Sequence, residues 1–439
     1  MFLGGRNLGP LVASISYSAS SSSAWTILGV SGYAYFAGFS AIWLLVGSLV
    51  GHGASWFWLS ESVRMRSRAE GSITMTEFIT HDCEKRHKKL ATYVATGIIV
   101  FLFILYVASQ LQGAGNAFNS AFNLPPFQSI VIGGAVVLVY TLLGGFWAVS
   151  LTDTVQGLLM FAAAVFLPVF AITAIGGCAE FYTQTLREFS EDQSSLSFTF
   201  DGISALTFVV GLVSVGFGVF GQPHLITRFM ATRDTAAIRR AKAYTVIWFS
   251  IVYGGMILIG WSGRILLPEI ASNETVFFDL VNFLCHPIVA GILVAAVLSA
   301  VMSTADSQLL VVASTFAHDL DWESRVSSAM LMARIIIVVV TVAAIVIALA
   351  LPATIFERVL LAWNALGGAF GPLVILRAMG VRLRSESVVT AMLLGFSVAL
   401  VFNLFIDTPG DVGERMLPFV CSLFYLLFWG RASAVKSIA

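Results

Sequence analysis

The stretch AAVLSAVMSTADSQLLVVAS, residues 295–314, places hydroxyls and a carboxylate inside a run otherwise apolar enough to cross a bilayer. On a helix, four polar residues of this stretch share one side because they are spaced i, i+4, i+7 and i+8: Ser299, Ser303, Asp306 and Ser307. A charge at mid-bilayer costs roughly 2.5–3.5 kcal/mol on insertion scales, so Asp306 is a candidate functional residue. Clustered hydroxyl, carbonyl and carboxylate oxygens suit a hard cation. The alternative is that the hydroxyls only hold one helix against its neighbour.

The composition is that of a polytopic membrane protein. Of 439 residues, 58% are hydrophobic and 11% charged, and the mean hydropathy is +0.90, far above the range of soluble globular proteins. The 24 basic and 24 acidic residues balance, so no nucleic-acid partner is indicated. The four cysteines form no CxxC pair, which leaves metal and redox motifs absent.

About twelve apolar runs are long enough, at about 20 residues each, to cross the hydrocarbon layer as helices. They fall near 8–35, 38–62, 91–119, 127–147, 151–175, 204–227, 243–267, 287–316, 326–350, 354–377, 386–406 and 415–430. The predicted fold class is therefore all-α.

The charges between these runs are sorted by sign. The loop before the third run and the loop after the sixth are basic, and we expect both in the cytoplasm: Arg64, Arg66, Arg68, Lys85, Arg86, Lys88 and Lys89 in the first, and Arg228, Arg233, Arg239, Arg240 and Lys242 in the second. The acidic loops 178–201 and 268–286 are expected outside. Alternation through twelve spans then leaves the N-terminus and the tail after Arg431 in the cytoplasm of a plasma (inner) membrane protein.

Two of the runs are poor candidates for continuous helices. Residues 14–23 hold seven serines, and the sixth run is interrupted by glycines and a proline, at Gly211, Gly216, Gly218, Gly221 and Pro223. Irregular backbone at membrane depth persists only where it is buried or lines a cavity, and breaks at matching places in two halves indicate a transporter's binding site. Five spans from each break have opposite orientations, which predicts an inverted repeat. The alternative is that Gly and Pro are simply common in membrane helices.

Several motifs, in order along nearly the whole chain, resemble the sodium/solute symporter family and most closely its proline/sodium branch. They are FLGGRNLGP at 2–10, SISYSASSSSAW at 14–25, LYVAS at 105–109, LLGGFWAVSLTDTVQ at 142–156, FGQPHLITRFMA at 220–231, SAVMSTADSQLLV at 299–311 and AWNALGGAFGP at 362–372. The resemblance implies a LeuT-like five-plus-five inverted repeat with two extra C-terminal helices. The core would span 1–378, with repeats at 8–175 and 204–378, and residues 379–439 would form the two accessory helices and a short tail.

The resemblance also implies a sodium ion held between the first and eighth spans. The carbonyls of Ala19, Ser22 and Ala300 and the hydroxyls of Ser303 and Thr304 would bind it. Asp153 matches a residue near the family's ion exit or second sodium site, with Asp306 and Ser307 as its partners. A Thr-Asp pair opening a helix is also typical of an N-cap, so that alternative stays open for Asp153.

The implied solute site lies at mid-membrane between the broken spans. Its candidate residues are Ser20, Ser21, Trp25, Tyr106, Gln110, Val215, Val219, Gln222, Trp363 and Asn364. Three departures from the family pattern matter: the chain begins just before FLGGR, where family members carry one more helix, Ser21 replaces an Asp, and Val215 and Val219 replace a Trp and a Tyr. We therefore expect a solute other than proline. Half-helix N-termini at the breaks favour an anionic group such as a carboxylate.

The predicted function is sodium-coupled symport of a small organic solute, an amino acid or carboxylate-like molecule, by alternating access. The expected partners are that solute, sodium as the coupling ion and the lipid bilayer. The alternative is a solute-sensing receptor module of the same fold, which would need an output domain, and only a short tail follows the last span. An enzyme is not expected, because the six histidines are dispersed and no nucleophile–base motif is visible.

Overall fold

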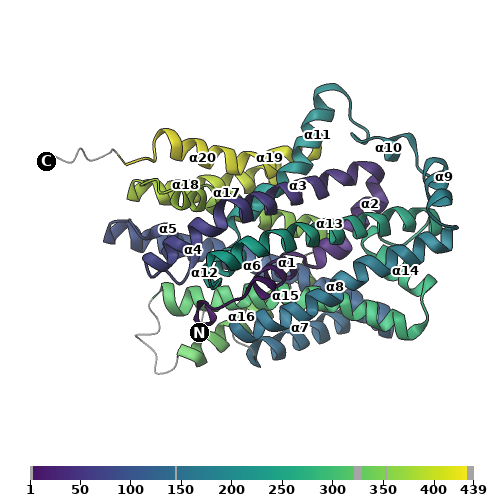
Figure 1. Ribbon diagram of the computed structural model, residues 1–439, viewed down its shortest axis with the longest axis horizontal. Helices are drawn as coiled ribbons and strands as arrows, with labels where there is room; N and C mark the ends of the chain where they lie inside the picture. The colour runs from purple at the N-terminus through teal and green to yellow at the C-terminus, as the bar shows by residue number, and fades with distance from the viewer. Residues whose placement is uncertain (1–2, 144–145, 321–328, 352, 433–439) are drawn as a thin grey trace.

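The computed structural model describes residues 3–143, 146–320, 329–351 and 353–432, and within these the secondary structure is helical apart from two isolated β-bridges (Figure 1). The first half holds η1 (Gly4–Arg6), α1 (Pro10–Ser21), η2 (Trp25–Gly29), α2 (Val30–Ala37), η3 (Gly38–Ala41), α3 (Ile42–Ala54), η4 (Ser55–Leu59), α4 (Ser60–Ala69), α5 (Met75–Thr80), α6 (Lys85–Phe122), α7 (Pro126–Leu143), α8 (Phe146–Ile175), α9 (Cys178–Glu188) and α10 (Glu191–Ser194).

The second half begins with another broken span and ends with two helices outside the predicted repeats. It holds α11 (Gly202–Ser214), η5 (Val215–Gly221), α12 (Pro223–Ala231), α13 (Thr235–Leu266), η6 (Asn273–Thr275), α14 (Val276–Leu284), α15 (Pro287–Ser314), η7 (Thr315–Asp319), α16 (Ala329–Ala350), α17 (Ile355–Ala378), α18 (Ser385–Phe405), η8 (Pro409–Asp411), α19 (Val412–Arg415) and α20 (Leu417–Phe428).

Ten helical stretches of the described chain are long and apolar enough to cross a membrane. The number falls short of the twelve predicted spans for two reasons. The first span is divided, and its second half continues into the second span as one stretch, Trp25–Ala69. The last helix, α20, has only 12 residues.

Both predicted helix breaks are confirmed. The first span leaves the α-helix at Ser22, whose backbone lies at φ −86° and ψ 78°. The sixth span winds more tightly through η5, a 3₁₀-helix, and is then extended at Gln222 (φ −83°, ψ 108°) before Pro223 opens α12. Pro at the first position of a helix costs no hydrogen bond, so the chain restarts there easily.

Helix α17 lies in the middle of the bundle and is buried along most of its length. The 3₁₀ stretch η5 packs closely against it because glycine leaves room for backbone contact. A Cβ atom on Gly218 would lie 1.9 Å from the Trp363 ring, and one on Gly221 would lie 2.1 Å from the Leu366 carbonyl oxygen. The broken sixth span is thus held against the tenth.

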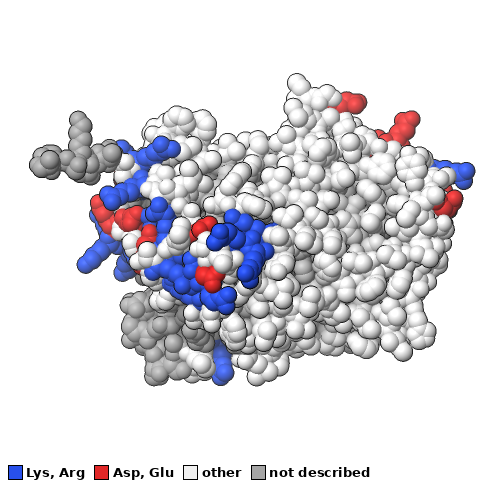
Figure 2. Space-filling model, in the orientation of Figure 1, with Lys and Arg blue, Asp and Glu red and all other residues white. Residues whose placement is uncertain are grey.

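The two ends of the bundle differ in charge, as Figure 2 shows. We call the end formed by α4, α5, α12 and the starts of α6, α13 and α18 the basic end. The end formed by α9, α10, η6, η8 and α19 is the acidic end. The described chain includes Arg431 and Ala432 of the predicted tail, at the basic end, while residues 433–439 lie outside the description.

The prediction that Arg228 lies in a basic loop is wrong. Arg228 lies within α12 and is 1% exposed. Its neighbours in sequence, such as Arg233, are exposed at the basic end, so a count of charges along the chain could not separate the buried cation from the solvated ones.

Candidate functional site

Oxygens of the first and eighth spans converge where the first span breaks. The Ser303 hydroxyl donates to the carbonyl oxygens of Ala19, at 3.2 Å, and Ala300, at 3.1 Å. The Thr304 hydroxyl donates to the Ser20 carbonyl at 3.0 Å. All of these residues are buried. Hydroxyl and carbonyl oxygens at such short spacing form a donor set that fits sodium, which could replace the hydrogen bonds between them.

The predicted sodium ligands are therefore brought together in part. Ala19, Ala300 and Ser303 meet directly, and Thr304 reaches Ser20, a carbonyl that the sequence did not single out. Ser22 lies at the break itself, where its hydroxyl accepts a hydrogen bond from Trp248 Nε1 at 3.1 Å. That bond ties the break to α13.

A buried ion pair lies one helical turn nearer the basic end. Asp153 Oδ2 accepts hydrogen bonds from the hydroxyls of Ser16, at 2.7 Å, and Ser20, at 3.2 Å, and from Arg228 Nη2 at 3.1 Å. Arg228 Nη2 also donates to the Ser307 hydroxyl at 2.6 Å. The side chains of Arg228 and Asp153 are 2% and 0% exposed. Four spans, the first, fifth, sixth and eighth, meet in this cluster.

Asp153 is not an N-cap, because it lies well inside α8 (Phe146–Ile175). The structure places Asp153 and Ser307 together, as the sequence suggested, but the group between them is a guanidinium. Asp306 is fully buried, and no other described helix donates a hydrogen bond to its carboxylate oxygens. The signal that could have identified Arg228 was its position five residues after Pro223, within an intramembrane motif.

A small cavity lies between the two broken spans. It is lined by six of the predicted solute-site residues: Ser21, Trp25, Tyr106, Val215, Val219 and Trp363. Its volume is about 10 Å³, which is at the lower limit for a single water molecule. In this conformation the cavity is closed around its own side chains, and none of the lining residues carries a formal charge if His52 is neutral.

The other four predicted solute-site residues do not line this cavity, and their hydrogen bonds join other parts of the bundle. The Ser20 hydroxyl belongs to the Asp153 cluster. Gln110 Oε1 accepts from the Ala24 backbone N–H at 3.0 Å. Gln222 Nε2 donates to the carbonyls of Gly218 and Trp363, at 3.0 and 3.1 Å, and Asn364 Nδ2 donates to Glu414 at 3.1 Å.

His52 of α3 is a cavity residue that sequence reasoning missed. Its ring hydrogen-bonds the Tyr17 hydroxyl at 3.0 Å and the Ser21 hydroxyl at 3.3 Å, and it stacks on Phe249 at 3.7 Å. The cavity also includes Ser48 and Tyr253. A histidine in the middle of an apolar span is itself a signal, because polar side chains at membrane depth are expensive.

Aromatic side chains separate the small cavity from a large one at the acidic end. The Phe356 ring stacks on Trp25 with centroids 5.6 Å apart and on Tyr33 at 5.0 Å. Glu274 holds the backbone of this segment, since its carboxylate accepts from the N–H groups of Ile355 and Phe356 at 3.1 and 2.8 Å. Beyond the ring stack, a vestibule of about 880 Å³ opens between the loops of the acidic end.

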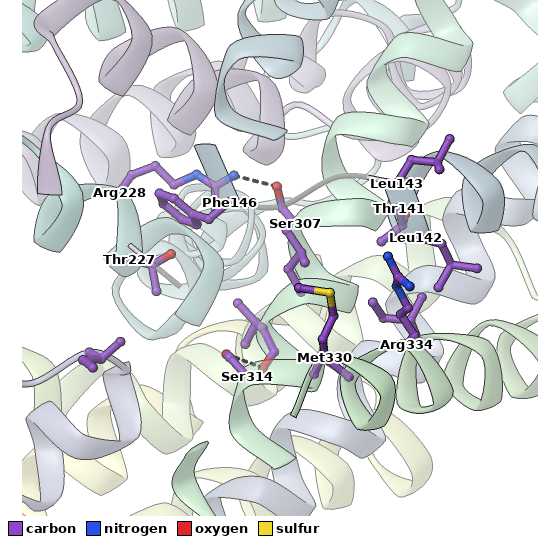
Figure 3. Close-up of a pocket in the computed structure, with 16 residues that line it drawn as sticks. Thr141, Leu142, Leu143, Phe146, Thr227, Arg228, Ser307, Ser314, Met330 and Arg334 are labelled. Carbon is purple, nitrogen blue, oxygen red and sulfur yellow. Dashed lines mark hydrogen bonds between the residues drawn. The ribbon is translucent and has the colours of Figure 1, made fainter. Parts of the chain in front are cut away.

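A third cavity, of about 200 Å³, lies at the basic end (Figure 3). It extends between α7, α8, α12, α15 and α16, and its lining includes Thr141, Phe146, Arg228, Ser307 and Arg334. Figure 3 shows the hydrogen bond from Arg228 to Ser307 at its edge. The small cavity and the predicted sodium ligands therefore lie between two larger cavities, one at each end.

Comparison with known proteins agrees with this architecture. The family model described as the sodium:solute symporter family matches residues 1–395. The high-affinity proline transporter PutP of Bacillus subtilis (strain 168) is 33% identical over 410 residues, covering 91% of this chain and 85% of that protein. The osmoregulated proline transporter OpuE of the same organism is 34% identical over 411 residues, covering 91% and 82%.

Solved transporters share the fold. A sodium-coupled sialic acid symporter in a substrate-bound outward-open state superposes with a TM-score of 0.79 at 19% identity, covering 98% of this chain and 92% of that one. Mhp1, a nucleobase-cation-symport-1 family transporter in a closed conformation, gives 0.63 at 14% identity, covering 97% and 93%. The architecture is therefore the LeuT fold, and with a family model matched along most of its length and relatives above 30% identity, the chain belongs to the sodium:solute symporter family.

Proposed function

We propose that this protein imports a small organic solute, an amino acid or a carboxylate-like molecule, together with sodium. The observation that supports this most directly is the convergence of Ser303 with the carbonyls of Ala19 and Ala300 beside the break in the first span. The first span carries both sodium ligands and solute-cavity residues, so ion binding and solute binding act on the same broken helix. Sodium in this set would favour a conformation that also binds the solute.

We propose that the basic end, where Arg431 and Ala432 lie, faces the cytoplasm, and we expect the C-terminus on the same side. One elementary charge crossing 100 mV is worth ~2.3 kcal/mol, so each co-transported sodium ion supports about a fiftyfold solute gradient, before any sodium gradient is added. The membrane potential alone is then sufficient for accumulation. The cytoplasmic or plasma (inner) membrane is the location that such a potential requires.

The solute cavity is proposed to accept something other than proline. Val215 and Val219 line it where the proline/sodium branch has a Trp and a Tyr, so the walls against the solute are smaller. A carboxylate would find no arginine or lysine in the cavity lining. Its partners would be backbone N–H groups at the broken helices and the sodium ion itself.

Proline is the second candidate solute, favoured by the names of the two relatives that are 33% and 34% identical. A single competition experiment separates the two. Purified protein in proteoliposomes, with an imposed sodium gradient, is given radiolabelled proline, other amino acids and monocarboxylates in turn. We expect uptake that requires sodium and a solute that outcompetes proline. If proline outcompetes all other solutes, the inference from Val215 and Val219 is wrong. If no solute shows sodium-dependent uptake, the proposal of symport is wrong.

A further inference from the structure

Arg228 joins its own helix to three other spans through buried polar contacts. Its guanidinium bonds to residues of the first, fifth and eighth spans and to a carbonyl of α12, and its donors are all directed inward rather than to solvent. Nη2 donates to Ser20 at 3.0 Å, Asp153 at 3.1 Å and Ser307 at 2.6 Å; Nε donates to Ser16 at 3.3 Å; Nη1 donates to the carbonyl of His224 at 2.8 Å. A planar guanidinium is suited to such simultaneous contacts, which a single ammonium group cannot reproduce.

The guanidinium lies on the route from the sodium ligands to the basic end. Ser303 and Ser307 are one turn apart on α15, and of the two only Ser307 reaches the cavity at that end. Ser20 joins both sites, because its carbonyl accepts from Thr304 and its hydroxyl accepts from Arg228. An ion leaving Ser303 toward the basic end therefore meets Arg228 before it meets the cavity.

The charge of Arg228 is permanent, since the guanidinium does not deprotonate in proteins. While it lies between Asp153 and Ser307, it occupies the oxygens that would otherwise replace the hydration shell of a passing cation, and it repels that cation. The route is closed to sodium both sterically and electrostatically in this conformation.

The neighbouring cavity offers the guanidinium a second position. Arg228 itself lines this cavity of about 200 Å³, and the Phe146 ring lies there with its centroid 5.3 Å from Cζ. That distance is already a cation–π contact, so Phe146 holds the guanidinium together with Asp153 and Ser307 in this conformation, and it would remain a partner if the side chain moved into the cavity.

Resting on the symport function proposed above, we infer that Arg228 is the inner ion gate. Its guanidinium binds Asp153 and Ser307 to keep sodium from leaving toward the basic end, and it moves into the adjoining cavity, keeping its contact with Phe146, to release sodium when the inner side opens. Arg228 is on this view a positioning residue whose movement couples sodium release to the conformational change.

A simpler role for Arg228 would be to neutralise the buried carboxylate of Asp153 and so allow folding. The two roles differ in what a charge-neutral double variant does. If Arg228 only balances charge, replacing both Arg228 and Asp153 with uncharged isosteres restores the low sodium leak of the wild type. If Arg228 is the gate, the double variant still lacks the barrier and still leaks.

The test is sodium leak without solute. Proteoliposomes containing the purified protein are loaded with ²²Na⁺, and efflux is followed with no solute on either side. We expect Arg228→Gln to raise the protein-dependent efflux about tenfold, the change that follows when a barrier falls by ~1.4 kcal/mol. Arg228→Lys should leak to an intermediate degree, and Arg228→Gln with Asp153→Asn should leak as Arg228→Gln does.

Arg233→Gln is the matched control, because Arg233 lies at the same end, is 56% exposed and pairs only with its neighbour Asp234. It should leak no more than the wild type. Sodium efflux at the wild-type rate, from either Arg228→Gln or the double variant, would overturn the gate. If Arg228→Gln does not fold, the test uses Arg228→Lys instead. Sodium efflux from Arg228→Lys at the wild-type rate would then overturn the gate. Absence of any sodium-dependent uptake in the wild type would instead contradict the symport function.

Discussion

Single residues in this protein take part in two polar clusters at once. Ser20 is the clearest case, because its backbone carbonyl accepts a hydrogen bond from Thr304, a predicted sodium ligand, and its hydroxyl belongs to the Asp153 cluster. At the residue scale, the resemblance predicted that hydroxyls on α15 lie beside carbonyls of the first span, and the contacts of Ser303 and Thr304 agree with that, while their binding of sodium stays a prediction. The sequence did not predict the partners of Gln110, Gln222 or Asn364, because their hydrogen bonds join helices far apart in the chain.

The carboxylate of Glu77 provides a residue-scale prediction of pH dependence. Oε1 accepts from His318 Nε2 at 2.9 Å and Oε2 accepts from the Ile73 N–H at 2.7 Å, and the first of these bonds holds α5 against η7, which continues α15. Burial acts to raise the pKa of Glu77, but the hydrogen bonds from His318 and the backbone outweigh it and leave the pKa below its usual 4.5. The pair therefore stabilises the fold above about pH 4.5, and this stabilisation is lost as the pH falls through the lower, folded-state pKa.

We expect Glu77→Gln to lower the unfolding temperature in detergent at pH 7, because a hydrogen bond to a charged group contributes about 1.5–3 kcal/mol. The difference in unfolding temperature between the variant and the wild type should shrink as the pH is lowered below 4.5. Asp319, which accepts from Thr74 at 2.7 Å, faces the same cluster; burial, together with the nearby charge of Glu77, raises the pKa of Asp319 to about 7, so the comparison of pH dependence between the two proteins is made below pH 4.5, where Asp319 is protonated in the wild type. Glu84→Gln is the control, since that side chain is 80% exposed. A difference that stays constant with pH would contradict the assignment.

Among the elements, the two broken helices were the most predictable. Serine crowding and glycine spacing are local signals, and the breaks lie at Ser22 and Gln222, beside the residues that the sequence marked. What the sequence could not supply is the close contact between η5 and α17, because that contact depends on how the second repeat folds back on itself.

This contact gives a prediction for Gly221. A Cβ atom there would lie 2.1 Å from the Leu366 carbonyl oxygen and 2.8 Å from the Gly367 Cα, and neither backbone atom can move without shifting α17. We expect Gly221→Ala to destabilise the protein by about 1–3 kcal/mol or more, as overpacking does. The measurement is the unfolding temperature of purified protein in detergent.

Gly97→Ala on α6 is the matched control, because nothing lies within 4 Å of its added Cβ. There, alanine should be neutral or stabilise the helix by about 0.5–1 kcal/mol. An equal effect of the two substitutions would show that the η5–α17 contact is not a tight one.

For the whole molecule, composition and charge sorting predicted a polytopic helical bundle with a basic and an acidic end. The exception is Arg228, which the sequence grouped with solvated loop residues and the fold buries among four spans. Charge sorting is a statistical property of loops, whereas the burial of one cation depends on a partner such as Asp153, 75 residues away in the chain. The functional centre therefore emerged only from the assembled bundle.

Sodium binding between the first and eighth spans is the central prediction for this protein, and equilibrium binding of ²²Na⁺ to the purified protein tests it most directly. We predict saturable binding, with the half-saturating sodium concentration raised about tenfold or more in Ser303→Ala and in Thr304→Ala, a loss of ~1.4 kcal/mol or more. Ser299→Ala, the same change one turn away on α15, should bind sodium as the wild type does. Wild-type sodium saturation in the double variant Ser303→Ala with Thr304→Ala would contradict the account and leave these hydroxyls with a role in helix packing alone.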